Sequence, residues 1–216
     1  MKKLLTTAAM VLSLATGASA QEKTEFKVAW SIYVGWMPWG YLEESGIMDR
    51  WADKYGIDVE IVQINDYIES INQYTAGEFD GVSATNMDTL SIPSGGGVDS
   101  TALIVGDFSN GNDAVILKGE GDLTSLAGMP VNLVELSVSH YLLARGSDSV
   151  GLSEADLDGV INTSDADMIA AFATDDVQAV VTWNPLVSTI LEDPAATKLF
   201  DSSDIPGEII DLMVVN

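Results

Sequence analysis

The chain has 216 residues, of which 33 are acidic and 9 are basic, so its formal net charge at pH 7 is −24. Such a field repels nucleic acid and anionic lipid, because both are bound through lysine and arginine, and we exclude those partners. Hydrophobic residues make up 47 % of the chain, which supports a packed core rather than disorder. The acidic residues are spread along the whole sequence. We favour solubility or adaptation to salty water as the reason for this excess of acidic residues, and attraction of a cationic ligand is the alternative.

The first twenty residues predict export. Lys2 and Lys3 precede an uncharged apolar stretch at 4–15, and Ala18-Ser19-Ala20 has the A-x-A form of a cleavage site. The apolar stretch is shorter than the roughly 20 residues that cross a bilayer. We therefore expect a cleaved signal peptide at 1–20 and a mature protein that begins near Gln21.

The sequence contains no cysteine. Bacterial lipid anchors, disulfides and thiolate metal sites all need cysteine, so the three are excluded together. No segment after the signal peptide is apolar over a length that would span a membrane. A freely diffusing periplasmic protein without membrane insertion is the resulting expectation.

Strands and helices are predicted to alternate in the first half of the chain. Period-2 and helical patterns, with glycines at the stops, define the elements. In chain order they are a strand at 26–33, a helix at 39–55, a strand at 58–64, a helix at 66–76 and strands at 79–83 and 100–105.

A second block of the same plan follows a β-branched run at 114–117. Its predicted elements are a strand at 129–134, a helix at 138–145 closed by Gly146, a strand at 159–162, a helix at 166–173, a strand at 177–182, a helix at 185–191 and a strand-like run at 209–215. Two such blocks predict two parallel sheets covered by helices. Because the sequence stops on a strand within this pattern, we expect a truncated C-terminus.

Four stretches, in this order, resemble one protein family. They are 36–47 (WMPWGYLEESGI), 74–81 (YTAGEFDG), 137–146 (SVSHYLLARG), and 170–172 (AAF) with 177–185 (VQAVVTWNP). Together they resemble the nitrate/taurine/sulfonate-type solute-binding proteins of ABC importers, over nearly the whole predicted mature chain. The match looks most similar to the branch associated with urea carboxylase, whose cargo is urea- or guanidine-like.

The resemblance implies an α/β, type II periplasmic-binding-protein fold with a ligand cleft between two lobes. Lobe one is expected at 21–115, lobe two at 116–204, and a return hinge strand at 205–216. Family members normally continue with helices that complete lobe one, so lobe one is expected to be incomplete. The implied partners are a small-molecule ligand and the importer's permease subunits, with the protein itself a monomer.

In open α/β sheets, ligands bind beyond the carboxyl ends of the strands. Thr85 and Asp88 fall at such a position, after the third predicted strand. The candidate ligand-binding residues chosen by the same rule are Tyr33, Trp36, Asn86, Asp107, Glu135, Ser137, Ser139, His140, Asp165, Trp183 and Asn184.

Several candidates allow two interpretations. Ser137 stands at a predicted helix start, where free N–H groups could receive an anion, or where it could simply cap the helix. Glu135 would repel an anion and suits a guanidinium or amide N–H donor, unless it is an exposed loop residue. Trp36 and Trp183 could stack on a flat cation or belong to the core. His140, the single histidine, could contact ligand or pack within its helix.

The sequence favours a receptor over an enzyme. It contains no G-x-S-x-G elbow, H-E-x-x-H motif, P-loop or dinucleotide fingerprint. We therefore expect no catalytic residues, cofactor or metal, and a solute-binding protein that captures a small nitrogen-rich solute. Three alternatives remain: a sulfonate, taurine or nitrate-type anion receptor; an enzyme like the thiamine-pyrimidine synthases, which share the fold; and a sensor that signals to a membrane kinase.

Overall fold

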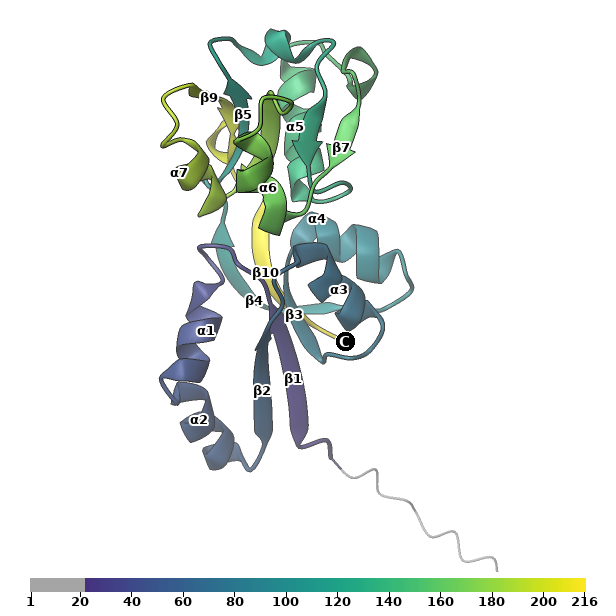
Figure 1. The fold of residues 1–216 in the computed structure, drawn as a ribbon. Helices are drawn as coiled ribbons and strands as arrows, with labels where there is room; N and C mark the ends of the chain where they lie inside the picture. The colour runs from purple at the N-terminus through teal and green to yellow at the C-terminus, as the bar shows by residue number, and fades with distance from the viewer. Residues whose placement is uncertain (1–21) are drawn as a thin grey trace, which may run out of the picture.

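The structure, a computed structural model, describes residues 22–216, so the predicted signal peptide lies outside the described residues. The described chain forms two lobes, and each contains a five-stranded sheet with helices packed on it (Figure 1).

The sheet of lobe one has the strand order β2-β1-β3-β10-β4. β1 pairs in parallel with β2 and β3, whereas β10 pairs antiparallel with β3 and β4. The strands are β1 (Glu25–Trp30), β2 (Asp58–Gln63), β3 (Gly81–Thr85), β4 (Thr101–Phe108) and β10 (Ile210–Val215). The helices are α1 (Met37–Glu44) and α2 (Ile47–Tyr55) beside β2, α3 (Tyr67–Thr75) on β1 and β3, and α4 (Asn86–Thr89), which continues as a π-helix at Leu90–Ser94.

The sheet of lobe two repeats this plan in the order β7-β6-β8-β5-β9. Here β6 pairs in parallel with β7 and β8, and β5 runs antiparallel to β8 and β9. The strands are β5 (Asp113–Lys118), β6 (Val131–Leu133), β7 (Val160–Asn162), β8 (Ala179–Trp183) and β9 (Ala196–Asp201). The helices are α5 (Val138–Ser149), α6 (Asp165–Phe172) and α7 (Leu186–Ile190), with 3₁₀ turns at Leu123–Leu126, Glu154–Asp156 and Ser202–Asp204.

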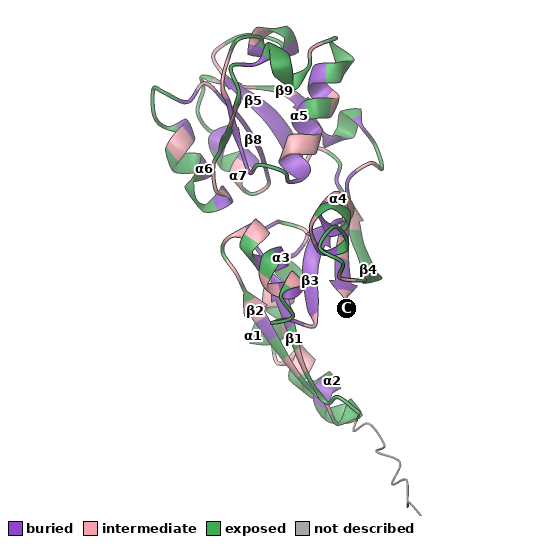
Figure 2. Cartoon of the chain, turned by 90° about the vertical axis from the view of Figure 1, so that its right-hand side faces the viewer, coloured by how far each residue is buried: buried purple, intermediate pink, exposed green. Residues whose placement is uncertain are grey.

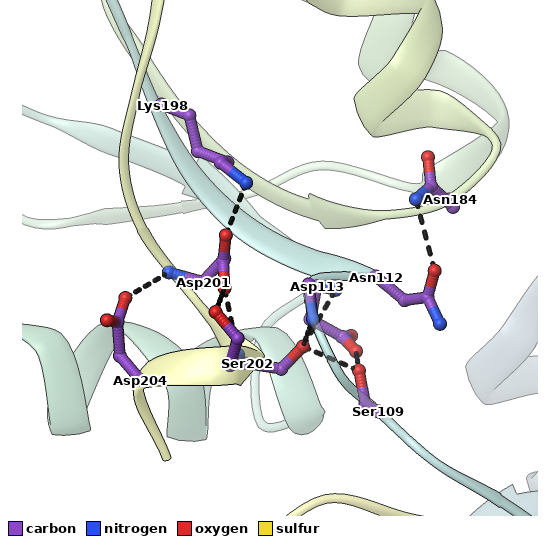
Figure 3. A network of polar contacts seen from close by, with 10 residues as sticks. Ser109, Asn112, Asp113, Asn184, Lys198, Asp201, Ser202 and Asp204 are labelled. Atoms are coloured by element: carbon purple, nitrogen blue, oxygen red, sulfur yellow. Dashed lines mark hydrogen bonds and ion pairs between the residues drawn. The ribbon is translucent and has the colours of Figure 1, made fainter. Parts of the chain in front are cut away.

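The chain crosses between the lobes twice, from β4 into β5 and from β9 into β10 (Figure 1). The two crossings are hydrogen-bonded to each other through Ser202, whose buried hydroxyl lies 2.8 Å from the Ser109 hydroxyl and accepts from the Gly111 amide, also at 2.8 Å (Figure 3). The Ser109 hydroxyl also donates to Asp113, the first residue of β5. The hinge region is therefore a polar network rather than two independent linkers.

The core of lobe two lies on both faces of its sheet. β5 and β8 are buried along their length, drawn in purple in Figure 2. On one face, Met168 and Phe172 of α6 and Val187 of α7 pack against Ile116 and Val180. On the other face, α5 covers β5 and β8. This cover explains why both strands read as continuous apolar runs.

Lobe one has an apolar edge that the described chain leaves exposed. β4 is the last strand of its sheet, and its apolar side chains Leu103, Ile104, Val105 and Phe108 are all exposed.

The predicted type II fold is confirmed, but the prediction of two parallel sheets is wrong. Each sheet is mixed, because a strand arriving from the other lobe enters it antiparallel. The helix predicted at 39–55 is two helices, because Gly46 takes a left-handed conformation with φ of 64° between α1 and α2. β9 was not predicted at all.

Gly146 does not close its helix, as predicted, but lies inside α5, which runs on to Ser149. A Cβ at this position would lie 3.1 Å from the ring of Phe200 in β9. The glycine therefore allows β9 to pack closely against α5, which explains the residue without a helix stop.

The hinge network predicts a difference between two adjacent serines. Ser202→Ala removes the acceptor of the Gly111 amide in a buried site, so we expect a loss of about 1–3 kcal/mol in the free energy of unfolding. Ser203→Ala removes an exposed hydroxyl that donates to Asp201, and Asp201 Oδ1 still accepts from the Ser203 amide, so this change should cost less than about 1 kcal/mol. Urea unfolding of both variants measures the difference, and equal costs would contradict the structural role given to Ser202.

Candidate ligand-binding cleft

A small cavity lies between the two lobes. Its lining residues come from both lobes and are Tyr33, Trp36, Tyr67, Thr85, Asp113, Val138, Trp183 and Asp211. The cavity volume is about 10 Å³, room for about one water molecule. A solute can therefore reach these side chains only when the lobes separate.

The two sheets place these residues at their facing edges. Tyr33 and Trp36 follow β1, Thr85 ends β3, and Trp183 ends β8. β10 arrives antiparallel, so Asp211 near its start lies opposite Thr85 on one side and Asp107 on the other. In the same way, Asp113 at the start of β5 pairs with Trp183. The incoming strand of each lobe thus contributes an aspartate to the cavity wall.

Four aromatic rings form a connected cluster in the cleft. Trp36 lies 5.2 Å from Tyr33, edge to face, and 5.4 Å from Tyr67. Tyr67 is in turn 5.4 Å from Trp183 of lobe two, again edge to face. Trp183 also crosses the cleft through its indole N–H, which donates to the Ile32 carbonyl at 3.1 Å. The cluster therefore joins the two lobes as well as lining the cavity.

Asp88 links the lobes at the start of α5. Its Oδ2 accepts from the Tyr67 hydroxyl at 2.6 Å, the Thr85 hydroxyl at 2.9 Å and the Val138 amide at 3.2 Å. The next amide of α5, that of Ser139, donates to the capping hydroxyl of Ser137 at 3.1 Å. The N-terminus of this helix is thus already satisfied by a carboxylate and a serine of the chain itself.

Three buried carboxyls lie at the cleft, and two of them, Asp113 and Asp211, line the cavity. Asp88 is 1 % exposed, and Asp113 and Asp211 are each 3 % exposed. Burial raises the pKa of Asp88 to about 6 and that of Asp113 to about 7. Burial, together with the nearby carboxyls of Asp107 and Asp113, raises the pKa of Asp211 to about 9. Burial and the same carboxyls also raise the pKa of the Tyr33 hydroxyl.

Among the buried side-chain polar atoms of residues 22–216 that accept or donate no recorded hydrogen bond, besides Ser139 Oγ at the start of α5, three matter for the cleft. They are Oδ1 of Asp88, Oδ2 of Asp211 and the indole Nε1 of Trp36. A buried polar atom without a partner costs free energy, so such atoms mark where a ligand would be favoured. Of these atoms, only those of Asp211 and Trp36 belong to residues of the cavity lining, and the Asp211 carboxyl, whose pKa is about 9, keeps its proton at neutral pH and hydrogen-bonds with Asp107.

The structure brings some of the sequence-predicted residues to the cavity and not others. Tyr33, Trp36 and Trp183 line it, and Asp107 lies behind them, 3.5 Å from the Tyr33 hydroxyl. Four others form hydrogen bonds near the contact between the lobes. Ser137 accepts from the Ser139 amide at the start of α5, Asp165 accepts from the Tyr67 amide, and the Asn184 side chain donates to that of Asn112.

Three predicted residues lie away from the cavity lining. Asn86 binds the second crossing, donating to the Glu208 carbonyl and accepting from the Ile210 amide. Glu135 is exposed in a separate surface groove. His140 contacts Glu154 at 3.0 Å, at the mouth of a different hollow.

Sequence reasoning missed four lining residues: Tyr67, Asp113, Val138 and Asp211. The sequence could have indicated two of them, because Asp113 and Asp211 are each an ionisable residue at the start of an otherwise apolar strand. An ionisable residue at such a position is unfavourable unless it faces a polar site.

No protein-family model and no curated sequence matches the chain, but it is similar to solved structures of periplasmic binding proteins. The alkanesulfonate-binding protein of Xanthomonas axonopodis pv. citri, bound to MOPS, aligns with a TM-score of 0.74 and 19 % identity over 91 % of this chain and 67 % of that protein. The aliphatic sulphonate binding protein of Escherichia coli gives 0.74 and 18 % over 88 % and 64 %. The nitrate-binding protein of Synechocystis PCC 6803 gives 0.69 and 13 % over 90 % and 56 %.

These neighbours are binding proteins rather than enzymes, and the chain spans about two thirds or less of their length. Within residues 22–216, no helix has the length and apolarity to cross a membrane. The same residues contain no group of three or more histidine or carboxylate side chains placed to hold a metal ion. The shared architecture of two mixed five-stranded sheets is that of the type II periplasmic binding proteins.

The buried carboxyls predict how stability depends on pH. Asp88, Asp113 and Asp211 have pKa values of about 6, 7 and 9 in the folded chain, above the ordinary 3.8. Between pH 3.8 and about pH 9 the folded state binds more protons than the unfolded state. The free energy of unfolding therefore falls as pH rises from about 4 to about 9. We expect a loss of at least about 2 kcal/mol between pH 5 and pH 9.

Asp211→Asn should reduce this loss, because asparagine resembles the protonated carboxyl and cannot ionise. Asp175→Asn, at an exposed site, should leave the slope as it is. Urea unfolding at pH 5, 7 and 9 measures the three slopes. A slope for Asp211→Asn that equals that of the unmodified chain would show that Asp211 does not titrate in this range.

Proposed function

We propose that this protein is the periplasmic solute-binding component of an ABC importer, and that it captures a small nitrogen-rich solute of the urea or guanidine kind between its lobes. The observation that carries the proposal is the interlobe cavity, whose walls combine aromatic rings and carboxyls from both lobes. The fold shared with sulfonate- and nitrate-binding proteins supports the receptor role.

The unpaired atoms of the cleft support the solute class. The Trp36 indole N–H in the cavity wall needs an acceptor, and Asp113 and Asp211 place two carboxyl groups in the same wall. A small solute that both donates and accepts hydrogen bonds, such as urea or guanidine, complements this set. The ring faces of Trp36, Tyr67 and Trp183 favour a flat ligand.

Capture would proceed by closure of the lobes about the two crossings. The separated lobes admit the solute, and the solute stabilises the closed form because it contacts both lobes at once. The lobes already touch through contacts such as the Val34 amide to the Asn184 carbonyl, at 3.1 Å, and Asp88 to α5, and the cavity of about 10 Å³ has no room for such a solute, so these contacts must part to admit it. The importer's permease subunits would then recognise the closed form, and no covalent step is needed.

The anion-receptor alternative has less support. The start of α5, where an anion would find free N–H groups, is filled by Asp88 and Ser137. None of the eight described residues that line the cavity is lysine or arginine. The enzyme alternative has no support from His140, which lies outside that lining.

A paired tryptophan test checks the site. The mature chain is screened by thermal shift with urea, guanidinium, simple amides, taurine, alkyl sulfonates and nitrate. A ligand at 100 times its dissociation constant should stabilise the protein by about 2.7 kcal/mol. Trp36→Leu should weaken binding at least about tenfold because it removes a ring of the cavity wall, whereas Trp51→Leu, 51 % exposed on α2, should not.

Titration calorimetry of both variants gives the dissociation constants. Equal affinities for Trp36→Leu and Trp51→Leu would place the ligand outside the interlobe cavity. A folded mature chain that binds no compound in the panel would contradict the receptor proposal itself.

A further inference from the structure

We propose that separation of the lobes is coupled to proton release: Asp107, Asp113 and Asp211 form a carboxyl cluster at the two crossings, which holds the lobes together while protonated and drives them apart when ionised. This inference rests on the proposed receptor function and adds a regulation of its cleft by pH. The transition that the protons control is the opening of folded lobes, not the unfolding of the chain.

The cluster lies where the chain passes between the lobes. Asp107 of β4 and Asp113 of β5 flank the first crossing, and Asp211 of β10 follows the second. Asp211 lies directly opposite Asp107 in the antiparallel pairing of β4 and β10, and their carboxyls are hydrogen-bonded to each other. One carboxyl can donate to another only through a proton, so this contact requires that one of the two is protonated. The pairing of the strands thus creates a proton-binding site.

The cluster spans both lobes. Asp107 and Asp211 belong to the sheet of lobe one, whereas Asp113 belongs to the sheet of lobe two. Asp113 and Asp211 both line the interlobe cavity, and each is 3 % exposed. Separation of the lobes would admit water to this cavity and hydrate both carboxyls. Their protonation therefore depends on whether the lobes are closed.

The groups that face the cluster are also acids. Those that face Asp211 are Tyr33, which follows β1, with Asp107 and Asp113, and those that face Asp113 are Asp107 and Asp88 of α4. The ion pairs within residues 22–216 leave the cluster without a basic partner. The basic residues of β9 and α5, which pack against β5, contact other acids: Lys198 with Asp201 (Figure 3), Arg145 with Glu208 and His140 with Glu154.

The direction of the coupling follows from these surroundings. In the closed chain, burial and the neighbouring carboxyls raise the pKa of Asp113 to about 7 and that of Asp211 to about 9. Water in an open cleft would lower both pKa values toward the ordinary 3.8. The closed form therefore binds more protons than the open form, and it loses stability relative to the open form as pH rises from about 4 to about 9. Repulsion between ionised Asp113 and the carboxyls of lobe one adds to this effect.

This coupling would set when the cleft admits solute. The cavity of the closed form has room for about one water molecule, so the protonated, closed form excludes solute. The apparent affinity for a solute falls with the fraction of chains that are competent to bind it. A rise in pH increases that fraction, because it favours the open form.

A distance measurement between the lobes tests the coupling without any solute. The sequence contains no cysteine, so Asn72→Cys in lobe one and Glu135→Cys in lobe two give one pair of spin-label sites on the same surface groove, both exposed. Double electron–electron resonance of the mature chain at pH 6, 7.5 and 9, at constant ionic strength, gives the populations of short and long distances. We expect the ratio of closed to open chains to fall at least tenfold from pH 6 to pH 9, because each proton released on opening changes this ratio by up to about tenfold per pH unit.

Asparagine variants of the labelled chain test the residues. Asparagine resembles a protonated carboxyl and cannot ionise, so Asp211→Asn should reduce the pH dependence of the ratio, and the double variant Asp113→Asn with Asp211→Asn should reduce it further. Asp175→Asn, exposed on lobe two, should leave the pH dependence unchanged. Melting curves verify that each variant folds. Should the double variant not fold, Asp113→Asn alone provides the comparison for the carboxyl of lobe two.

The outcomes distinguish this inference from the receptor function. A ratio that is constant with pH, including a chain that stays closed or stays open throughout, would overturn the coupling and leave the receptor function standing. Equal pH dependence in Asp211→Asn and Asp175→Asn would overturn the assignment to the cluster. The expected change of ratio in a chain that binds no compound of the solute panel would support the coupling and contradict the receptor function.

Discussion

The structure depends on one topological constraint: the chain passes between its lobes twice, and each time it enters the new sheet antiparallel to the strand beside it. A strand that runs antiparallel to its neighbour begins at the edge of the sheet where that neighbour ends. The first residues of β5 and β10 therefore reach the same edge as the carboxyl ends of β8 and β3. That edge is where ligands bind in α/β sheets. The crossings thus connect the lobes and also deliver Asp113 and Asp211 to the cleft.

The energetics of those carboxyls connect ligand charge with lobe closure. A rise in the pKa of Asp113 from 3.8 to about 7 corresponds to about 4 kcal/mol against the ionised form. A unit positive charge 4 Å away, at an effective dielectric constant of about 20, returns about 4 kcal/mol. The two quantities are of the same size, so one bound cation can offset the cost of ionising a cleft carboxyl. Without a cation, the same closure either retains protons in the cleft or buries unpaired charge.

The sequence predicted the order of elements in both lobes because apolar periodicity and glycine stops are local signals. The mixed sheets were missed, since periodicity does not report strand direction, and β9 was missed because only Phe200 and Asp201 of its residues are buried. In the cleft, the carboxyl-end rule found Tyr33, Trp36 and Trp183, which follow parallel strands. It could not find Asp113 or Asp211, which begin antiparallel ones, because their position depends on a pairing between distant segments.

A fold defines where a ligand can bind but not its charge. The similar structures are named for binding sulfonates and nitrate, and this chain shares their architecture at below 20 % identity. The start of α5 shows how the ligand's charge can differ within one fold. Its first amide, that of Val138, is a donor that an anionic solute could use, but here it donates to Asp88. Asp88 reaches it from lobe one, held by the Tyr67 and Thr85 hydroxyls. The chain therefore supplies its own carboxyl group to the start of the helix. A single side chain from the other lobe thus occupies the position where the fold would otherwise offer a free amide to an anion.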